Sequence, residues 1–208
     1  MTLFHFVRHG AVDNPNKLYY GRLPGFPLSP SGRQQARQAA ASLRSQPIAA
    51  IFSGPLLRTR QTAAVIAADF PSLKVHVSAS LQEVYSPFDG LPASAMLARD
   101  WDAYSGTPAP YEQPADVLRR TLRFIYRVLQ QYSGQQVVAV THMDPIQWVT
   151  LWALNAPVTV ESRAHFAELG LPPGFPALAS LTTLAWQETG QAALISLGFG
   201  AGSGKLRS

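Results

Sequence analysis

Three adjacent residues, Arg8, His9 and Gly10, place a guanidinium, an imidazole and a flexible turn side by side. They directly follow the apolar run 3–7, which predicts a buried strand, so they lie at the carboxyl end of that strand. A guanidinium binds oxyanions through paired hydrogen bonds, and a neutral imidazole nitrogen is nucleophilic near pH 7. The triplet therefore has the groups needed to hold a phosphoryl group and attack it. Alone, however, such a triplet is more often a loop histidine beside a surface cation.

Three further residues favour phosphoryl chemistry. Arg58 stands in the opening turns of an expected helix that follows a strand, where the helix dipole and the guanidinium both attract an anion. His142 is a second histidine between a strand and a helix, and Glu83 supplies a carboxylate that leads into a proline-rich segment. Positive charge, imidazole and carboxylate groups thus occur at separate points of the chain.

The elements that position these residues follow from apolar periodicity and from helix caps. Ser29 is a suitable helix N-cap with Pro30 at the first helical position. Residues 116–132 carry an apolar stripe at helical spacing, and the β-branched run 136–140 predicts a buried strand. The full expectation is strands at 3–7, 48–52, 75–77 and 136–140, helices at 30–45, 58–68, 116–132 and 145–154, a short helix near 93–104, and a hairpin of 181–186 and 193–197 turned around 188–190.

Strands that alternate with helices predict an α/β fold with a mostly parallel sheet covered by helices on both faces. In such sheets ligands bind at the carboxyl edge of the strands. His9 and His142 each follow a strand, so both are expected at that edge. We predict a single domain over residues 1–199, two insertions at about 85–115 and 155–178 that lie over the site, and a disordered Gly/Ser-rich tail at 200–208.

Taken together, these motifs resemble those of the histidine phosphatase superfamily, in its phosphoglycerate mutase-like branch. One motif block runs from Arg8-His9-Gly10 through Leu28-Ser29-Pro30-Ser31-Gly32-Arg33-Gln34-Gln35-Ala36, and a second is the S-x-P-L-x-R-x-x-Q-T-A block around Arg58. The resemblance spans about Leu3 to Leu197. It implies a three-layer α/β sandwich and a phosphoenzyme mechanism.

The resemblance also implies roles for individual residues. His9 would be the nucleophile, Arg8 and Arg58 would bind the phosphoryl oxygens, and His142 would donate a further hydrogen bond to them. This set can neutralise the charge of a transferred phosphoryl group without a metal or other cofactor. The remaining substrate-binding candidates come from the loop after the first histidine and from the start of the helix after the second: Asn14, Asn16, Tyr20, Gly21, Arg22 and Met143.

Two departures from the family pattern leave alternatives open. The family commonly has an Asn a few residues after the nucleophile, and here either Asn14 or Asn16 can take that place. Met143 stands where the family often has Gly after the second histidine. The backbone N–H of Met143 can still face a phosphate, but its side chain narrows the pocket.

The proton donor has three candidates. Glu83 matches the general acid of the phosphoglycerate mutase-like branch, where it would protonate the leaving alkoxide and later take a proton from water. Asp144 is a rival, because the acid phosphatase branch places its donor just after the second histidine, and Asp89 is a weaker third. We favour Glu83, since the rest of the chain follows its branch. A bound phosphate dianion beside this carboxyl should raise its pKa by like-charge repulsion.

The expected function is metal-independent hydrolysis of small phosphomonoesters. A phosphoglycerate mutase activity is the first alternative. Mutases of the family usually follow the acid with a Glu-Arg-His-Tyr-Gly type run, whereas Val84-Tyr85-Ser86-Pro87 follows Glu83 here. A catalytically inactive binding or regulatory protein of the same fold is the second alternative, and a competent residue at every primary position argues against it.

Composition limits the partners. The chain has 208 residues, 17 Lys+Arg against 12 Asp+Glu, and no cysteine, which excludes disulfides and thiolate metal sites. The arginines are scattered, so we expect a small phosphorylated metabolite as partner and no nucleic acid. His5 has no further ligand cluster in view, which indicates a packed strand histidine and no metal site. Without a signal-peptide pattern or an apolar run of about 18 residues, we expect no membrane and a cytoplasmic monomer or homodimer.

Overall fold

The strands form a seven-stranded sheet with the N-terminal strand in its interior. The computed structural model describes residues 1–187, 192–199 and 202–205. The strands are β1 Thr2–Arg8, β2 Ile48–Ser53, β3 Val75–Val77, β4 Gln136–Thr141, β5 Leu181–Trp186, β6 Ala192–Phe199 and β7 Gly202–Lys205. Their order is β3-β2-β4-β1-β5-β6-β7, in which β1 to β4 pair in parallel and β5 to β7 are added antiparallel.

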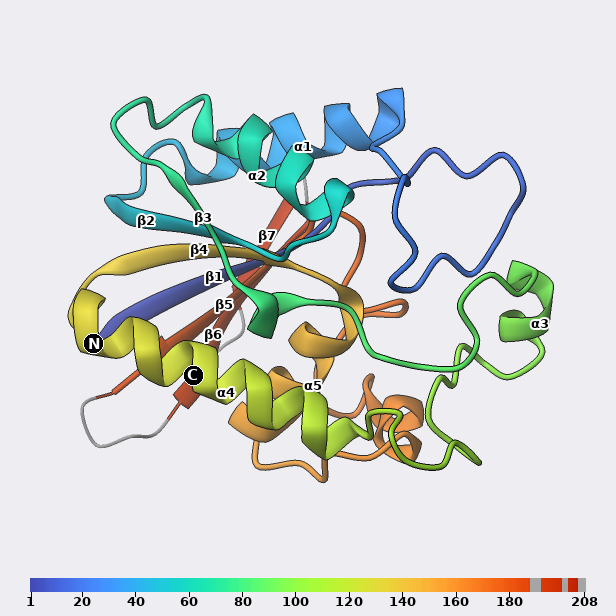
Figure 1. Cartoon of the computed structure of the whole chain (residues 1–208). Coiled ribbons are helices and arrows are strands. Elements are labelled where there is room, and N and C mark those ends of the chain that lie inside the picture. Colours follow the sequence, from blue (N-terminus) through green and yellow to red (C-terminus); the bar gives the residue numbers. More distant parts are fainter. Residues whose placement is uncertain (188–191, 200–201, 206–208) are drawn as a thin grey trace.

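Helices cover both faces of this sheet (Figure 1). α1 (Pro30–Leu43) and α2 (Leu57–Ala67) lie on one face, and α4 (Pro114–Tyr132) and α5 (Met143–Ala153) lie on the other. The short helix α3 (Ala93–Leu97) and two 3-10 helices, Ala79–Leu81 and Glu161–His165, belong to the connections. The predicted three-layer α/β sandwich is confirmed.

Alternating side chains of the central strand fill two separate cores. Phe4 and Phe6 of β1 are fully buried in the core beneath α4 and α5, whereas Val7 belongs to the core beneath α1 and α2. Successive strand residues point to opposite faces, so an apolar run fills both cores only where helices cover both sides.

His5 bonds through both ring nitrogens to side chains of β4 and β5, each at 2.9 Å, which confirms a packed strand histidine.

Local signals set where the helices begin. Ser29 caps α1 by accepting a hydrogen bond from the Gly32 N–H at 3.0 Å, as predicted. α5 begins at Met143, two residues before its predicted start, because Pro145 in the first turn loses no helical hydrogen bond. α2 and α5 thus each begin within a few residues of the strand that precedes them.

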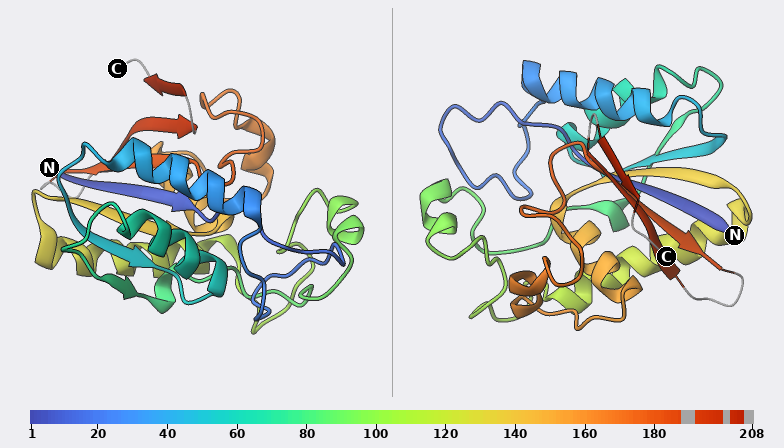
Figure 2. Two further views of the ribbon diagram at one scale, coloured as in Figure 1. Left: turned by 90° about the horizontal axis from the view of Figure 1, so that it is seen from above. Right: turned by 180° about the vertical axis from the view of Figure 1, so that it is seen from behind.

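The strand register brings the two predicted histidines to one edge of the sheet. β1 and β4 run parallel with Arg8 opposite Thr141, and the His9 N–H donates to the Thr141 carbonyl at 3.0 Å. His9 and His142 therefore directly follow adjacent strands, which confirms the expectation. The loop 11–28 and α3 lie at this end of the sheet, away from the N-terminus, in every view (Figure 2).

Two irregular segments differ in part from their predictions. The short helix predicted near 93–104 forms but ends at Leu97, since Asp100 and Trp101 adopt the left-handed conformation, with φ of 50° and 58°. Part of the tail predicted as disordered forms β7, because its backbone pairs with β6 and such pairing does not depend on the side chains. The predicted turn around 188–190 lies outside the described residues.

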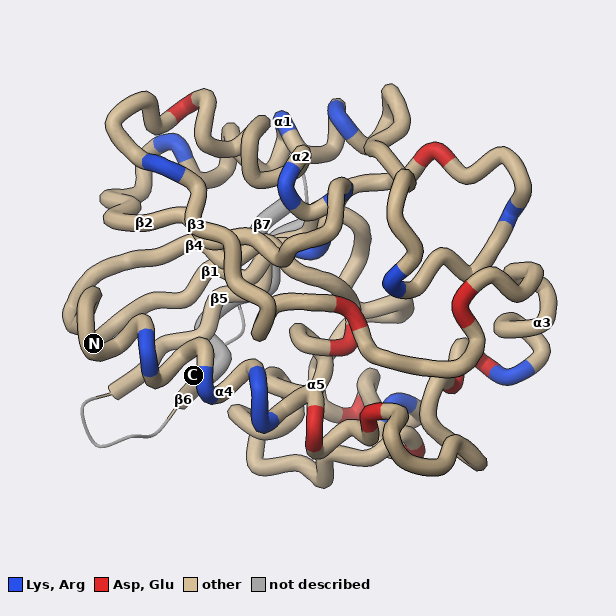
Figure 3. The backbone as a smooth tube through the Cα atoms, in the orientation of Figure 1, with Lys and Arg blue, Asp and Glu red and all other residues tan. Residues whose placement is uncertain are grey.

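Charged residues are spread over many elements of the molecule. Lys and Arg lie on α1, α2 and α4 and in several loops, with Asp and Glu between them (Figure 3). On α4, Arg119 pairs with Asp116 at 2.7 Å in an exposed contact. Within the described ranges, no helix has both the length and the apolar character needed to cross a bilayer.

Candidate active site

His9 follows β1 and is buried, with 1% of its surface exposed. Its Nδ1 lies 2.8 Å from the Gly10 carbonyl, so Nδ1 carries the proton and donates it, which leaves the lone pair on Nε2. The Arg58 Nε–H donates to this Nε2 at 3.2 Å. Burial, and then the charges of Arg58 and Arg8, hold the pKa of His9 well below its usual 6.5. The ring is therefore neutral at pH 7, with its nucleophilic nitrogen directed at Arg58.

Arg58 lies in the first turn of α2 and connects the other site residues. Its Nη2 donates to the Gly21 carbonyl at 2.7 Å and contacts His142 Nδ1 at 3.2 Å, while its Nε donates to His9 Nε2. The Tyr20 ring covers the guanidinium, with 4.7 Å between the ring centre and Cζ. Two of the acceptors of this buried cation are neutral imidazole nitrogens. An anion is a stronger acceptor, so its binding to Arg58 in place of the two nitrogens is favoured.

His142 is fully buried and is the N-cap residue of α5. A guanidinium only donates, so the contact from Arg58 makes His142 Nδ1 an acceptor and puts the ring proton on Nε2. This Nε2 has no hydrogen-bond partner among the described residues. The His9 and His142 ring centres are 5.2 Å apart. Since a buried N–H without a partner is costly, this donor is free to bind an oxygen of a ligand beside His9.

Arg8 is the last residue of β1 and lines the pocket described below. Its Nη1 donates to the Pro176 carbonyl at 2.8 Å. Its buried Nε has no partner within the part of the chain that the structure describes. The guanidinium therefore retains unused donors next to His9, as the binding of a phosphoryl group requires.

Glu83 brings a carboxyl group to the same cluster. Its Oε2 lies 3.4 Å from His142 Nδ1 and 3.8 Å from Arg58 Nη2, and its Oε1 accepts the Val84 N–H at 3.0 Å. Burial, and then the charge of Asp144, raise the pKa of Glu83 to about 7, although Arg58 opposes the shift. From the sequence we expected this rise from a bound phosphate, whereas here burial is the largest cause. Near pH 7 the carboxyl is thus present in both forms that acid–base catalysis needs.

A pocket of about 490 Å³ adjoins this cluster and is lined in part by Arg8, His9 and Glu83. Both predicted insertions contribute to its wall, through Trp101 of the first and Phe175 of the second. Four other predicted substrate residues also line it: Asn14, Tyr20, Gly21 and Met143. The volume is in the range of sites for small metabolites.

Four predicted substrate residues lie outside the lining of this pocket. Two of them, Arg58 and His142, belong to the buried cluster that the pocket adjoins. Asn16 is exposed on its loop. Arg22 is turned to other partners, since its Nε donates to the Glu83 carbonyl at 2.8 Å and its Nη2 pairs with Glu112 at 2.9 Å. Asn14 is therefore the better candidate for the family Asn, and Arg22 supports the backbone of Glu83 instead of facing a substrate.

The rival acids are engaged elsewhere. Asp144, in the first turn of α5, lines the pocket but forms an ion pair with Arg163. Asp89 accepts the Arg22 N–H at 2.8 Å and does not line the pocket. Of the three carboxyl groups, Glu83 is the one that contacts the candidate phosphoryl-binding groups, so the geometry favours Glu83 as the proton donor.

Several residues of the pocket lining were not among the predicted site residues, and Arg163 and Gln147 are two of them. Arg163, in the second insertion, lies over the Trp148 ring at 4.5 Å and pairs with Asp144. Gln147 also lines the pocket. Gln147 has a recognisable signal, since it lies four residues after Met143 and so on the same helix face. Nothing in the local sequence around Arg163 indicates that its side chain reaches Asp144.

His9, Glu83 and His142 also lie close enough together to be considered as ligands of a metal ion. Donor atoms of His9, Glu83 and His142 lie within 4.8 Å of one another. However, the Arg58 guanidinium occupies a nitrogen lone pair on each histidine, so a cation would have to displace another cation. The donor set therefore fits an anion better than a metal ion.

A buried, neutral histidine held by arginine beside a second histidine, at the carboxyl edge of a three-layer α/β sheet, is the arrangement of a histidine-based phosphoryl-transfer enzyme. The chain belongs to the histidine phosphatase superfamily (branch 1), whose family model matches residues 4–194. This match confirms the resemblance that the motifs around His9 and Arg58 indicated.

Comparisons with individual proteins agree with this membership. The chain is 34% identical over 172 residues to the uncharacterized protein Rv0525 of Mycobacterium tuberculosis, covering 79% of this chain and 82% of that protein. It is 29% identical over 148 residues to phosphoglycerate mutase-like protein 4 of Arabidopsis thaliana, covering 65% and 64%. Its structure resembles that of the mycobacterial glucosyl-3-phosphoglycerate phosphatase Rv2419c in complex with VO3, with a TM-score of 0.74, 25% identity and coverage of 92% and 96%.

Proposed function

We propose that the protein is a metal-independent phosphatase that hydrolyses small phosphomonoesters through a phosphohistidine on His9 Nε2. The observation that carries the proposal is the buried Arg58 guanidinium, which contacts His9 Nε2 and His142 Nδ1 at 3.2 Å each and lies 3.8 Å from Glu83. A phosphoryl dianion is a stronger acceptor than a neutral imidazole, so it takes over these donors and brings its phosphorus next to Nε2.

In the first step the phosphoryl oxygens bind Arg8, Arg58 and the Nε2–H of His142. The lone pair of His9 Nε2 attacks phosphorus, a P–N bond forms, and the bond between phosphorus and the ester oxygen breaks. Glu83 in its acid form gives its proton to the departing oxygen. The Gly10 carbonyl, 2.8 Å from His9 Nδ1, stabilises the positive charge that the ring acquires.

In the second step water replaces the alcohol. The oxygen of this water attacks phosphorus, and Glu83, now a carboxylate, takes a proton from the water as it does so. The P–N bond breaks and its electrons return to His9 Nε2, so the ring is neutral again. Inorganic phosphate then leaves, and Arg58 recovers His9 as an acceptor. The two arginines neutralise the charge spread over the phosphoryl oxygens in both steps.

Phosphate release from p-nitrophenyl phosphate in the presence of EDTA tests the proposed function. We expect full activity, because no step needs a metal. Loss of activity in EDTA that returns with Zn²⁺ would instead assign the cluster of His9, Glu83 and His142 to a metal. With 3-phosphoglycerate and a 2,3-bisphosphoglycerate primer we expect no 2-phosphoglycerate, whose appearance would support the mutase alternative. No turnover of any ester in a substrate panel would support the inactive binding protein.

Glu83→Gln should remove the alkaline limb of the pH profile for esters with poor leaving groups. The acid form of Glu83 is present below its pKa of about 7 and is lost as the pH rises through that value. For an alkyl phosphate, kcat/KM of the wild-type protein should therefore fall above about pH 7. Glutamine has no proton to transfer, so we expect the variant to be about 100-fold slower with this ester and to lack the limb.

Esters with good leaving groups provide the internal control for this prediction. p-Nitrophenolate departs without protonation, so kcat/KM of Glu83→Gln for its phosphate ester should stay within about threefold of the wild-type value. This ratio reports the steps up to formation of the phosphoenzyme and excludes the later attack of water, in which Glu83 acts as a base for every ester. Asp144→Asn is the matched carboxylate control and should keep the wild-type dependence on the leaving group. An equal loss of kcat/KM on all esters in Glu83→Gln, or a selective loss in Asp144→Asn, would contradict the assignment.

A further inference from the structure

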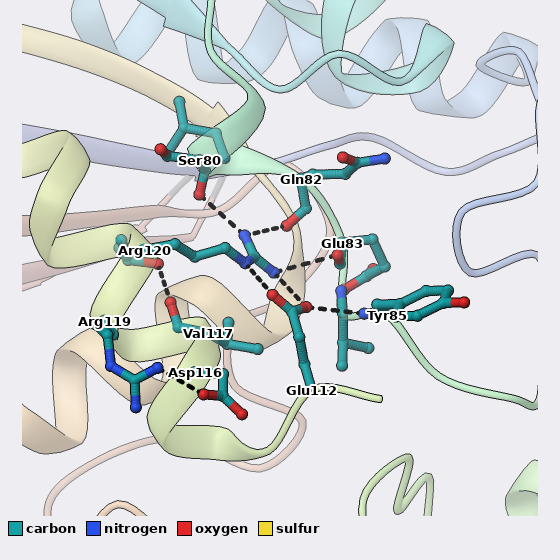
Figure 4. Close-up of polar contacts among 12 residues, drawn as sticks. Ser80, Gln82, Glu83, Tyr85, Glu112, Asp116, Val117, Arg119 and Arg120 are labelled. Carbon is teal, nitrogen blue, oxygen red and sulfur yellow. Dashed lines mark hydrogen bonds and ion pairs between the residues drawn. The ribbon is translucent and has the colours of Figure 1, made fainter. Parts of the chain in front are cut away.

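Arg120, on α4, does not line the pocket, yet it holds the backbone around Glu83 (Figure 4). Its Nη1 donates to the carbonyls of Ser80 and Gln82 at 2.9 and 2.6 Å, and its Nη2 donates to the Glu83 carbonyl at 3.1 Å. Its Nε and Nη2 also donate to the two Glu112 carboxylate oxygens at 2.8 and 3.2 Å. All five N–H groups of this guanidinium are thus engaged, and its side chain is only 11% exposed.

A second arginine reaches the same backbone from the loop 11–28. Arg22 donates through Nε to the Glu83 carbonyl at 2.8 Å and through Nη2 to Glu112 Oε2 at 2.9 Å. The same Oε2 accepts the Tyr85 N–H at 2.9 Å (Figure 4). The Glu112 carboxylate therefore bridges the two guanidinium groups, and the Glu83 carbonyl accepts a hydrogen bond from both of them.

Regular secondary structure does not hold this segment. The 3-10 helix Ala79–Leu81 ends two residues before Glu83, and no helix or strand of the described chain begins again before Ala93. Around Glu83, the carbonyls of Gln82 and Glu83 and the Tyr85 N–H have side-chain partners instead. A carbonyl that accepts from two arginines cannot rotate without losing both charge-assisted bonds, and it shares its Cα with the Glu83 side chain. These contacts therefore hold the backbone from which the Glu83 side chain extends toward His142 and Arg58.

We propose that Arg120, together with Glu112 and Arg22, positions Glu83 for proton transfer to the leaving group. This inference rests on the proposed function, in which Glu83 is the general acid. The three are positioning residues, because they hold the backbone of Glu83 and leave phosphoryl binding to other arginines. Since Glu112 belongs to the insertion 85–115 and Arg22 to the loop 11–28, the network also joins two pocket-lining segments to the acid.

The geometry predicts that lysine cannot replace Arg120. The contacts of Arg120 diverge from three nitrogens held in one plane, whereas an ammonium group offers three donors from a single nitrogen. Arg120→Lys keeps the positive charge beside Glu112 but cannot reach both the carboxylate and the three carbonyls. The backbone at Glu83 is then free to shift, and a displacement of about 1 Å at a catalytic group can cost about 100-fold in rate.

The experiment measures kcat/KM of Arg120→Lys for p-nitrophenyl phosphate and for an alkyl phosphate. We expect the alkyl ester to slow by about 10- to 100-fold and the nitrophenyl ester to stay within about threefold, because only the former needs the acid. Arg119→Lys is the matched control. It changes the neighbouring helix residue, whose exposed side chain pairs with Asp116, and should alter neither rate.

A double-mutant cycle separates positioning from general destabilisation. Arg120→Lys should cause no further loss on the alkyl ester in the Glu83→Gln background, because the group that it positions is already gone. Glu112→Gln, which keeps the side-chain shape, should show the same leaving-group dependence. It replaces Arg120→Lys in the test if that variant folds poorly. Equal loss on all esters, additive losses in the cycle, or unchanged rates in the folded variants would overturn the inference. If Glu83→Gln itself shows no dependence on the leaving group, the acid assignment of the proposed function fails first.

Discussion

His9→Ala should abolish phosphate release from every ester, with kcat reduced by about four orders of magnitude or more. The loss should not depend on the leaving group, because the variant lacks the nitrogen that forms the P–N bond. The hydroxyl groups near the site would need a base to become nucleophilic, so no neighbouring group takes over. The measurement is phosphate release from p-nitrophenyl phosphate and an alkyl phosphate by the wild-type and variant proteins.

Trapping of the phosphoenzyme supplies an independent readout for His9. Brief incubation with a ³²P-labelled ester followed by alkaline quenching should leave label on the wild-type protein and none on His9→Ala. His76→Ala is the matched control, because His76 is an exposed histidine on β3 and should change neither label nor rate. Turnover by His9→Ala near the wild-type rate would assign the reaction to direct attack by water.

Arg58→Lys should reduce kcat/KM by about 1000-fold for good and poor leaving groups alike. Arg58 donates to His9 through Nε, and to His142 and the Gly21 carbonyl through Nη2. The single nitrogen of a lysine cannot occupy the positions of both Nε and Nη2. The lost bonds act on the phosphoryl oxygens in the transition state, so the leaving group should not matter. This uniform loss distinguishes Arg58 from Glu83, whose removal is expected to lower kcat/KM only for esters with poor leaving groups.

The pKa of His9 gives a second readout for Arg58. In Arg58→Met the cation that lowers the pKa of His9 is gone, so this pKa should rise, while burial still holds it below 6.5. NMR titration of His9 measures the change. Arg60→Lys, an exposed change on the same helix, should leave both the rate and the pKa unaltered. An unchanged pKa in Arg58→Met would contradict the hydrogen-bonded pair.

The sequence was sufficient to predict which candidate site residues lie together wherever they follow the end of a strand. His9 and His142 both follow apolar runs, and parallel pairing of those runs places the two residues together whatever the loops do. The helix after residue 53 likewise begins close enough to its strand to bring Arg58 to the same edge. These residues were found because short-range patterns determine their positions.

Contacts between distant loops could not be predicted in this way. The sequence assigns no role to Arg120 and predicts Arg22 as a pocket residue. In the structure Glu112 joins these two arginines, which are 98 residues apart in the chain. The pairing of Arg163 with Asp144 similarly depends on how an irregular segment returns to α5. No periodicity encodes such contacts, because their partners lie on elements with no fixed spacing in the chain.

The interior position of β1 has a consequence for biosynthesis. Its partners are β4 at 136–141 and β5 at 181–186, so β1 is synthesised well before either strand with which it pairs. At the usual pace of translation, Phe4 and Phe6 remain in an unpaired apolar segment for on the order of ten seconds. Such long-range pairing also slows folding itself. A ribosome-bound chain therefore carries His9 without its second histidine until residue 142 has been added, and the cluster of His9, Arg58 and His142 assembles only after that.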